Sequence, residues 1–312
     1  MTVGWGFLGA GRIATHLAGV VAQAESATLV RVGASDPDRA ATLGQPGSYE
    51  DVLDDPRVAV VYIALANHQH RPWTMRALAA GKHVLCEKPL GLSLGEARSL
   101  AEAAEGRLVE ASFYRWHPLV AQAQALLDDI GPVEHVEGGF CFSGVPRSDY
   151  RMTAAYGGGA SLDVGCYPVS AALWAAGPVQ SVSARSRTVG DVDVATTYRL
   201  EHVSGATSDL VGSMDDPPRC WLVITGARGE IELRGHAFTG TGEARFGDGR
   251  GTRRLAGGGG GGYAAMVDAV SGWAAGGDDW VLPLEDSLAC AAVLDAAAVS
   301  AASGAAVVAL HD

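Results

Sequence analysis

Short apolar runs alternate with helical patterns over the first 118 residues of the chain. Strands are predicted near the N-terminus and at 27–36, 58–65, 83–87 and 108–113, and helices at 12–23, 37–45, 49–53, 72–80 and 93–105. The run VAVVYIAL (58–65) is almost wholly apolar, as expected for a strand that is covered on both faces. Strands that alternate with helices predict a parallel, doubly wound sheet.

The pattern changes after Pro118. One helix is predicted over 119–129, and the following runs are rich in β-branched residues with a period of two. These strands are predicted at 133–142, 179–189, 195–203, 220–235 and 244–249. Many strands with few helices indicate a mainly antiparallel sheet that is covered on one face. The six glycines at 257–262 predict a flexible loop, and a final alanine-rich helix is predicted at about 285–303. The change of pattern places the domain boundary between residues 118 and 119.

A glycine-rich turn joins the first strand to the first helix. It reads Gly9-Ala10-Gly11-Arg12-Ile13-Ala14, which is G-x-G-x-x-A in a strand–turn–helix setting. Gly9 allows the tight turn, Gly11 lets backbone N–H groups approach a pyrophosphate, and Ala14 lets the helix pack close to the strand. A helix N-terminus also favours an anion. The segment therefore predicts a dinucleotide site that includes Arg12 and Ile13, in a domain spanning 1–118.

Asp36 lies at the end of the second predicted strand, 25 residues after Gly11. A carboxylate there accepts both ribose hydroxyls of NAD and repels the extra phosphate of NADP. Its alternative role is the N-cap of the next helix, ahead of Pro37, and both roles are compatible. Arg39 keeps NADP open, because a nearby guanidinium binds a 2′-phosphate. We therefore expect NAD as the cofactor, with NADP as the alternative.

Composition and charge narrow the classes of partner. Apolar residues make up 48% of the chain and charged residues 19%, which supports packed cores and excludes disorder. The net charge of −12 disfavours nucleic acid and anionic membranes. The N-terminus lacks the basic and apolar regions of a signal peptide, and no apolar stretch is long enough for a membrane helix. The five cysteines have neither zinc-site nor disulfide spacing, so we expect no metal and a cytoplasmic location.

Two further segments carry candidate chemistry. In GKHVLCEKPL (81–90), Lys88 follows a buried strand, and it is one of only two lysines in the chain. From the residues alone, a lysine whose stem covers apolar surface is an equally good interpretation. In GGGASLDVGCYP (157–168), Asp163 and Tyr167 are four residues apart on a predicted helix and share a face. A capping Asp and a core Tyr are the alternative there.

Taken together, GAGRIA, ALANHQHRPWTMRALAAGKHVLCEKPL, YRWHP and GGGASLDVGCYPV resemble the Gfo/Idh/MocA oxidoreductases. The resemblance covers nearly the whole chain. It implies an α/β protein with an N-terminal Rossmann parallel sheet and a C-terminal α+β domain, here 119–312, with a large, mainly antiparallel sheet. The branch with dihydrodiol dehydrogenases, pentose dehydrogenases and deoxysugar ketoreductases is the most similar, because Tyr167 stands where many relatives have His.

The resemblance also implies roles for the site residues. Lys88 lies beside the nicotinamide, where we expect it to polarise the substrate oxygen, and Tyr167 is the expected acid/base. Their roles are exchangeable on the sequence alone. Asp163 orients Lys88 or a substrate hydroxyl. We expect Asn67, His70, Glu87 and Arg115 near the cofactor, and Trp116 and Arg151 near the substrate; His70 alone is more often a helix-start or packing residue.

The expected function is NAD(P)-dependent hydride transfer at a hydroxyl or keto carbon of a sugar, polyol or related cyclic diol. Two alternatives stay open at this point: a silent sensor or regulator with the same fold, and an NAD-dependent glycosidase. A homodimer or homotetramer is expected through the uncovered face of the second sheet.

Overall fold

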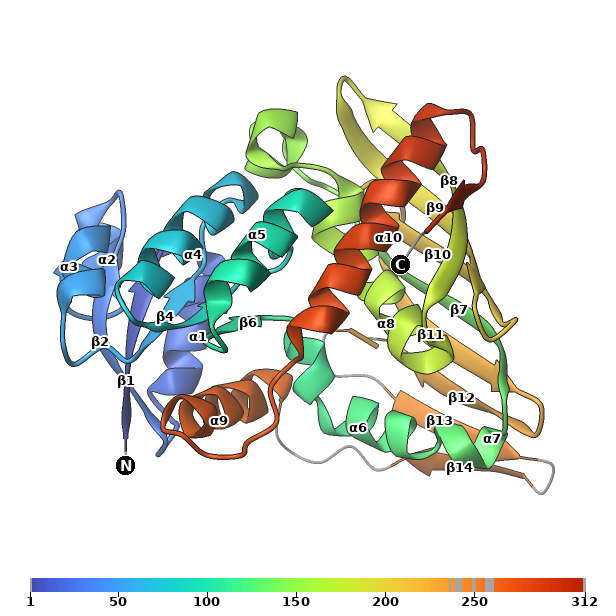
Figure 1. The fold of residues 1–312 in the computed structure, drawn as a ribbon, viewed down its shortest axis with the longest axis horizontal. Coiled ribbons are helices and arrows are strands. Elements are labelled where there is room, and N and C mark those ends of the chain that lie inside the picture. The colour runs from blue at the N-terminus through green and yellow to red at the C-terminus, as the bar shows by residue number, and fades with distance from the viewer. Residues whose placement is uncertain (1, 236, 239–242, 249–250, 256–260, 311–312) are drawn as a thin grey trace. The chain divides into compact units, whose positions relative to one another are not determined.

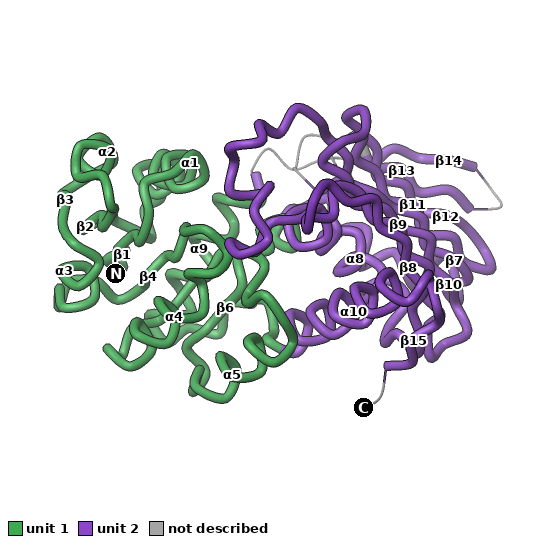
Figure 2. The backbone as a smooth tube through the Cα atoms, turned by 90° about the horizontal axis from the view of Figure 1, so that it is seen from above, with its two compact units in different colours: residues 1–116, 262–284 green, residues 117–261, 285–312 purple. Residues whose placement is uncertain are grey.

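The computed structural model describes residues 2–235, 237–238, 243–248, 251–255 and 261–310 (Figure 1). The chain forms two compact units. The first comprises residues 1–116 and 262–284, and the second comprises residues 117–261 and 285–312 (Figure 2). No helix in the described part of the chain is long and apolar enough to cross a membrane.

The first unit is built on a six-stranded sheet in the order β3-β2-β1-β4-β5-β6, and all of its strand pairs are parallel. The strands are β1 (Val3–Leu8), β2 (Ala27–Gly33), β3 (Pro46–Gly47), β4 (Val60–Ile63), β5 (His83–Cys86) and β6 (Leu108–Glu110). The helices are α1 (Arg12–Val21), α2 (Pro37–Ala41), α3 (Tyr49–Asp54), α4 (His70–Ala79), α5 (Leu94–Ala104) and α9 (Gly262–Ala274), with 3-10 turns η1 (Asn67–Gln69) and η2 (Phe113–Trp116). The strand order reverses between β1 and β4, which is where such sheets bind their ligands. The predicted parallel sheet is confirmed.

Helix α9 belongs to the first unit although it follows most of the second in sequence. The Trp5 indole Nε1 donates to Ser271 Oγ at 3.0 Å. The rings of Phe113 and Tyr263 stack with centroids 4.0 Å apart. The division expected from the sequence placed residues 262–284 with the second domain, because the glycine run before them hides any helical periodicity. The division of the chain into two folding domains, 1–118 and 119–312, stays a prediction.

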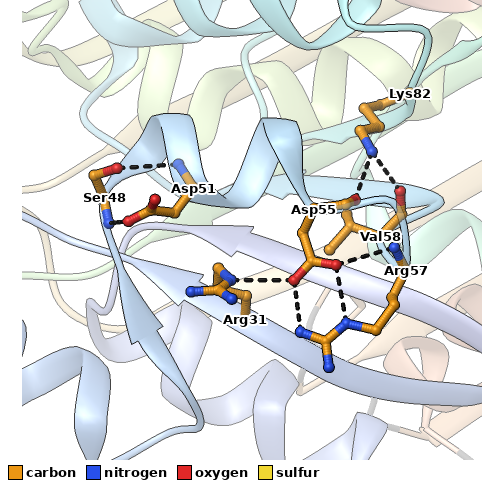
Figure 3. A network of polar contacts seen from close by, with 7 residues as sticks. All are labelled: Arg31, Ser48, Asp51, Asp55, Arg57, Val58 and Lys82. Carbon is orange, nitrogen blue, oxygen red and sulfur yellow. Dashed lines mark hydrogen bonds and ion pairs between the residues drawn. The ribbon is translucent and has the colours of Figure 1, made fainter.

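A buried polar network fixes the turn between α3 and β4 (Figure 3). The carboxylate of Asp55 accepts from the guanidinium of Arg57 at 2.7 Å and from Arg31 Nε at 3.2 Å. Lys82 Nζ donates to the carbonyl oxygens of Asp55 and Val58 at 2.9 and 2.8 Å. Lys82, one of the two lysines of the chain, therefore has a structural role in this turn.

The second unit is built on a nine-stranded sheet in the order β14-β13-β12-β11-β7-β10-β9-β8-β15. Among the described strands of this second sheet, β10 and β7 are the only parallel pair. The sheet is therefore mainly antiparallel, as predicted. The strands are β7 (Val133–Cys141), β8 (Val179–Val189), β9 (Val192–His202), β10 (Thr207–Ser213), β11 (Arg219–Gly226), β12 (Gly229–Arg234), β13 (Glu243–Asp248), β14 (Gly251–Leu255) and β15 (Val308–Ala309). The helices are α6 (Pro118–Ala125), α7 (Leu127–Ile130), α8 (Cys166–Ala176) and α10 (Leu284–Ala302), with 3-10 turns η3 (Tyr150–Met152) and η4 (Ala154–Tyr156) and the π-helix η5 (Ser161–Gly165). Most of the predicted glycine loop, 257–260, lies outside the described residues, but Gly262 begins α9.

One face of this sheet is covered by α8 and α10 (Figure 1). Its side chains, such as Val136, Leu200 and Ile224, are fully buried. The opposite face carries charged pairs across the strands, including Arg199 with Asp209 at 3.1 Å. The alternation of apolar and polar residues along each strand therefore separates a core face from an open face.

Candidate active-site residues

The glycine turn has the geometry that a pyrophosphate site requires. Gly9 has a φ of +110°, and a Cβ there would lie 2.3 Å from the carbonyl oxygen of Ala64, so only glycine fits. Gly11 is the N-cap of α1, and a Cβ there would meet nothing within 4 Å. Arg12 is exposed and Ile13 partly buried in the first turn, while Ala14 is fully buried. The unfilled space at a helix N-terminus fits the phosphates of a dinucleotide.

Asp36 is the N-cap of α2, so one of its expected roles is confirmed. Its Oδ1 accepts from the backbone N–H groups of Asp38 and Arg39 at 3.0 and 3.2 Å. Both bonds use the same oxygen, which leaves Oδ2 outside the cap. The side chains of Asp36 and Arg39 are exposed beyond β2. A ribose hydroxyl can therefore reach this carboxylate without disturbing the helix.

Lys88 lies in a backbone segment that is held at three points. The N–H of Glu87 donates to Ile63 O at 3.0 Å, which continues the pairing of β5 with β4. The Pro89 carbonyl oxygen lies 2.8 Å from His70 Nδ1, and the Leu90 N–H donates to Glu110 Oε1 at 2.8 Å. Lys88 is itself partly buried. Its side chain therefore projects from a fixed position at the carboxyl end of the sheet.

His70 is a tie between two strand ends. It is fully buried, and its Nε2 lies 3.0 Å from Leu65 O on the opposite side of the ring from Pro89 O. Burial lowers the pKa of His70. Both ring nitrogens are occupied by the backbone, so the packing alternative describes His70 here. Asn67, also buried, begins the 3-10 turn directly ahead of it.

Glu87 pairs with a tyrosine that sequence reasoning missed. The Tyr62 hydroxyl donates to Glu87 Oε1 at 2.6 Å, and Tyr62 is fully buried in β4. Burial is the main cause that raises the pKa of Glu87. Tyr263 of α9 lies close enough for Glu87 and Lys88 to influence its pKa, which burial raises. Tyr62 lies in a run that looks like plain apolar strand, so only its hydroxyl distinguished it.

Arg115 and Trp116 contact the loop that follows α9. Both are buried, and the Trp116 indole Nε1 donates to Trp280 O at 3.4 Å. The Arg115 guanidinium carbon lies 5.8 Å from the centre of the Trp280 ring. His117 has a structural role, because its Nδ1 accepts from Leu119 N at the start of α6.

Asp163 is held by an arginine of the loop before the glycines. Arg151 Nε donates to Asp163 Oδ2 at 2.9 Å, and the same guanidinium contacts Asp149 at 3.2 Å. Asp163 is buried and Arg151 partly buried. The neighbouring carboxylates, Asp163 first, hold the pKa of Arg151 above its usual value against the effect of burial. The guanidinium of Arg151 therefore joins Asp149 to Asp163.

Tyr167 is the second residue of α8, which directly follows the π-helix that carries Asp163. It is buried, and its ring centre lies 5.4 Å from that of Phe140 and 5.9 Å from that of Phe238. Single π-turns inside helices are frequent at functional sites. The expected regular helix is interrupted here, because Gly165 packs against Tyr198 and Gly212 where a side chain would not fit.

A second group missed from the sequence anchors this π-helix. Asp193 Oδ2 accepts from Ser161 N, Ser161 Oγ and Thr196 Oγ1 at 2.8, 2.7 and 3.0 Å. The Tyr198 hydroxyl donates to Ser161 Oγ at 2.8 Å. Desolvation raises the pKa of Asp193. An Asp in a strand of alternating residues gives no sequence signal for such a role.

Metal ligands do not cluster in the described residues: no group of three or more His, Cys, Asp or Glu side chains there is arranged to hold an ion. All five cysteines are buried thiols, and none of them forms a disulfide.

Comparison with known proteins gives matches to both units. Residues 3–113 match the Gfo/Idh/MocA oxidoreductase family model with an NAD-binding Rossmann fold, and residues 120–232 match the Gfo/Idh/MocA C-terminal domain. The chain is 35% identical over 243 residues to D-xylose 1-dehydrogenase (NADP(+)) 2 of Haloferax volcanii, covering 73% of this chain and 74% of that protein.

Two further proteins are similar over most of their length. The trans-1,2-dihydrobenzene-1,2-diol dehydrogenase of Mus musculus is 31% identical over 254 residues, which is 75% of each chain. The crystal structure of an aldose–aldose oxidoreductase from Caulobacter crescentus, complexed with glycerol, superposes with a TM-score of 0.91 at 26% identity. That match covers 99% of this chain and 100% of the other.

Proposed function

Because this chain belongs to the Gfo/Idh/MocA family of oxidoreductases, we propose that it is an NAD(P)-dependent dehydrogenase or reductase. It acts on a CH–OH or keto group of a sugar, a polyol or a related cyclic diol. Relatives named as xylose, dihydrodiol and aldose oxidoreductases support this substrate class. The observation that carries the proposal is the fixed backbone around Lys88, in the same unit as the open glycine turn.

The nicotinamide cofactor, when bound, gives or takes the hydride. The open turn at Gly9 and Gly11, with the N-terminus of α1, binds its pyrophosphate, and Asp36 binds the adenosine ribose. The exposed carboxylate of Asp36 favours NAD, while Arg39 keeps NADP as the alternative. In this proposal the cofactor site is lined or supported by Arg12, Ile13, Asn67, His70, Glu87 and Arg115. The contribution of His70 is indirect, because it holds two strand ends in place.

Proton movement is assigned to Lys88 and Tyr167. A free lysine and a free tyrosine have pKa values near ~10.4 and ~10. An ammonium near a phenol favours its ionised form, so together they can exchange a proton with a substrate oxygen. We assign Tyr167 as the acid/base and Lys88 as the group that polarises the oxygen. Asp163, held by Arg151, orients the substrate hydroxyls; Trp116 lines the substrate site.

The test is steady-state kinetics across a panel of aldoses, polyols and cyclic diols, followed by absorbance of the reduced nicotinamide. We expect Lys88→Met and Tyr167→Phe each to lower kcat by ~10²–10⁴-fold on the best substrate. Lys82→Arg is the matched control, because Lys82 binds backbone carbonyls of the α3–β4 turn. Near wild-type kcat in both site variants would refute the assignment. Bound cofactor without turnover on any substrate would indicate a sensor.

Assembly and location are also part of the proposal. The open face of the nine-stranded sheet fits a second copy of the chain. The basic assembly is then a homodimer, and two homodimers pair to form a homotetramer. On this face the Arg219 guanidinium carbon lies 3.7 Å from the centre of the Trp221 ring, which packs against Gly139. The five thiols fit a reducing, cytoplasmic location.

A further inference from the structure

The side chain next to Lys88 is bound by a fully buried phenol. Tyr62 OH lies 2.6 Å from Glu87 Oε1, which is the length of a charge-assisted O–H···O⁻ bond. β4 and β5 pair in parallel, with Ile63 opposite Cys86, so this bond joins two neighbouring strand ends. The Tyr62 ring is fixed from the other side by an edge-to-face contact with Phe7 at 5.0 Å.

We propose that Tyr62 is a positioning residue for Lys88 and acts through the carboxylate of Glu87. The inference rests on the function proposed above for Lys88. The hydroxyl of Tyr62 donates to Glu87, the residue next to Lys88 in the chain. Its effect on the reaction therefore passes through that carboxylate.

The physical reason is a balance of charge at the strand end. Burial raises the pKa of Glu87, whereas the Tyr62 hydrogen bond and the charge of Lys88 lower it. Burial and the negative charge of Glu87 raise the pKa of Tyr62 well above its usual value, so the phenol stays a donor. The hydrogen bond from Tyr62 thus favours the ionised form of Glu87. An ionised Glu87 in turn favours the ammonium form of Lys88.

Other groups act on the same carboxylate and ammonium. From the surrounding elements these are Tyr263 of α9, Glu110 of β6, Cys86 of β5 and His70 of α4. All of them remain in a Tyr62→Phe protein. The comparison with wild type therefore isolates the one hydroxyl.

Two lysines make the test direct. Protein labelled with ¹³C at lysine Cε gives one signal from Lys82 and one from Lys88, and Lys88→Met assigns them. We expect Tyr62→Phe to lower the titration midpoint of Lys88, because the carboxylate of Glu87 loses the donor that holds it in position. Glu87→Gln should lower it at least as much, and adding Tyr62→Phe to Glu87→Gln should change it no further. Lys82 is the internal control, bound to Asp55 O and Val58 O.

An unchanged Lys88 midpoint in Tyr62→Phe overturns the inference, as does a further shift in the double variant. If Tyr62→Phe does not fold, Glu87→Gln decides alone, because glutamine keeps an acceptor for the phenol; an unchanged midpoint there is also contrary. The titration needs no turnover. A failure of the proposed function appears separately, as full activity in Lys88→Met.

Discussion

Several side chains at the edge of the first sheet are held by backbone atoms. Asp36 caps a helix with one oxygen, neutral His70 lies between two carbonyl oxygens and donates to one of them, and Lys82 donates to two more. Each such contact fixes a turn at the edge of the first sheet. A substitution that keeps the hydrogen bond to the backbone but removes the charge therefore separates the structural role of such a side chain from its chemical role.

Asp36 allows such a separation for cofactor choice. Serine caps helices as well as aspartate does but carries no charge, so Asp36→Ser should keep stability and remove the repulsion of a 2′-phosphate. We expect the affinity for NADP relative to NAD to rise about tenfold, by fluorescence titration with both reduced cofactors. Asp36→Ala should give a similar change and also lose about 1 kcal/mol of unfolding free energy. An unaltered ratio in Asp36→Ser would exclude the ribose role.

Asp55 should make the fold acid-sensitive. Its bonds to Arg57, then the contact with Arg31, hold the pKa of Asp55 far below its usual value. A depressed carboxyl pKa stabilises the fold above the unfolded pKa, near ~3.9, and this contribution is lost as the pH falls through and below it. Asp55→Asn should therefore unfold at lower urea than wild type at pH 7, and the difference should shrink towards pH 3. The exposed neighbour Asp54→Asn is the control; equal midpoints for both variants at pH 7 would contradict the network.

At the scale of elements, close backbone packing places the π-helix on the second sheet. A Cβ on Gly212 of β10 would lie 2.6 Å from Gly165 Cα, and one on Gly165 would lie 2.3 Å from the Tyr198 hydroxyl. Asp193 then binds the first turn of the same helix. The position of Asp163 therefore depends on two glycines and on one carboxylate of a neighbouring strand.

Gly212→Ala should test this contact. The new methyl group has to displace backbone, so we expect a loss of about 1–3 kcal/mol of unfolding free energy and a lower kcat. Gly19→Ala is the opposite control: Gly19 is exposed in α1 with nothing within 4 Å, and alanine should stabilise by about 0.5–1 kcal/mol. Chemical denaturation of the two variants in parallel measures both. A neutral Gly212→Ala would mean that β10 and η5 separate easily.

The sequence predicted elements where periodicity and glycine signals were strong. The Rossmann strands, the turn at Gly9 and the last helix follow from local patterns. β10, with GATSDLVGS, was missed because its alternation is short and its parallel partner β7 lies about 70 residues earlier. The bonds of Tyr62 to Glu87 and of Asp193 to Ser161 were missed for the same reason. They join segments that only the folded chain brings together.

At the scale of the whole molecule, the open face of the nine-stranded sheet is the surface that we propose for self-association. Along one line of cross-strand neighbours it carries Arg199, Asp209, Glu137, Val223 and Glu232. This row carries one arginine, three carboxylates and the apolar Val223, and a two-fold partner packed there would bring the same residues across the axis. In our proposal, the site residues of the second unit and the self-association surface therefore lie on opposite faces of one sheet.

Val223→Arg should dissociate the proposed dimer. A guanidinium at position 223 would lie between the cross-strand neighbours Glu137 and Glu232, and its bulk on this face should weaken self-association by at least about tenfold, measured by sedimentation across a concentration series. Val203→Arg is the control, because Val203 is 68% exposed in the turn after β9. A wild-type chain that stays a monomer at all concentrations, or a variant that assembles normally, would rule out this face.

The late return of the chain to its first unit has a consequence during protein synthesis. Trp5 and Phe113 leave the ribosome early, but their partners on α9, Ser271 and Tyr263, are translated about 150 residues or more after Phe113. For most of translation the nascent nucleotide-binding half therefore presents uncovered aromatic surface. Molecular chaperones recognise such surface, which is covered only after α9 has been synthesised.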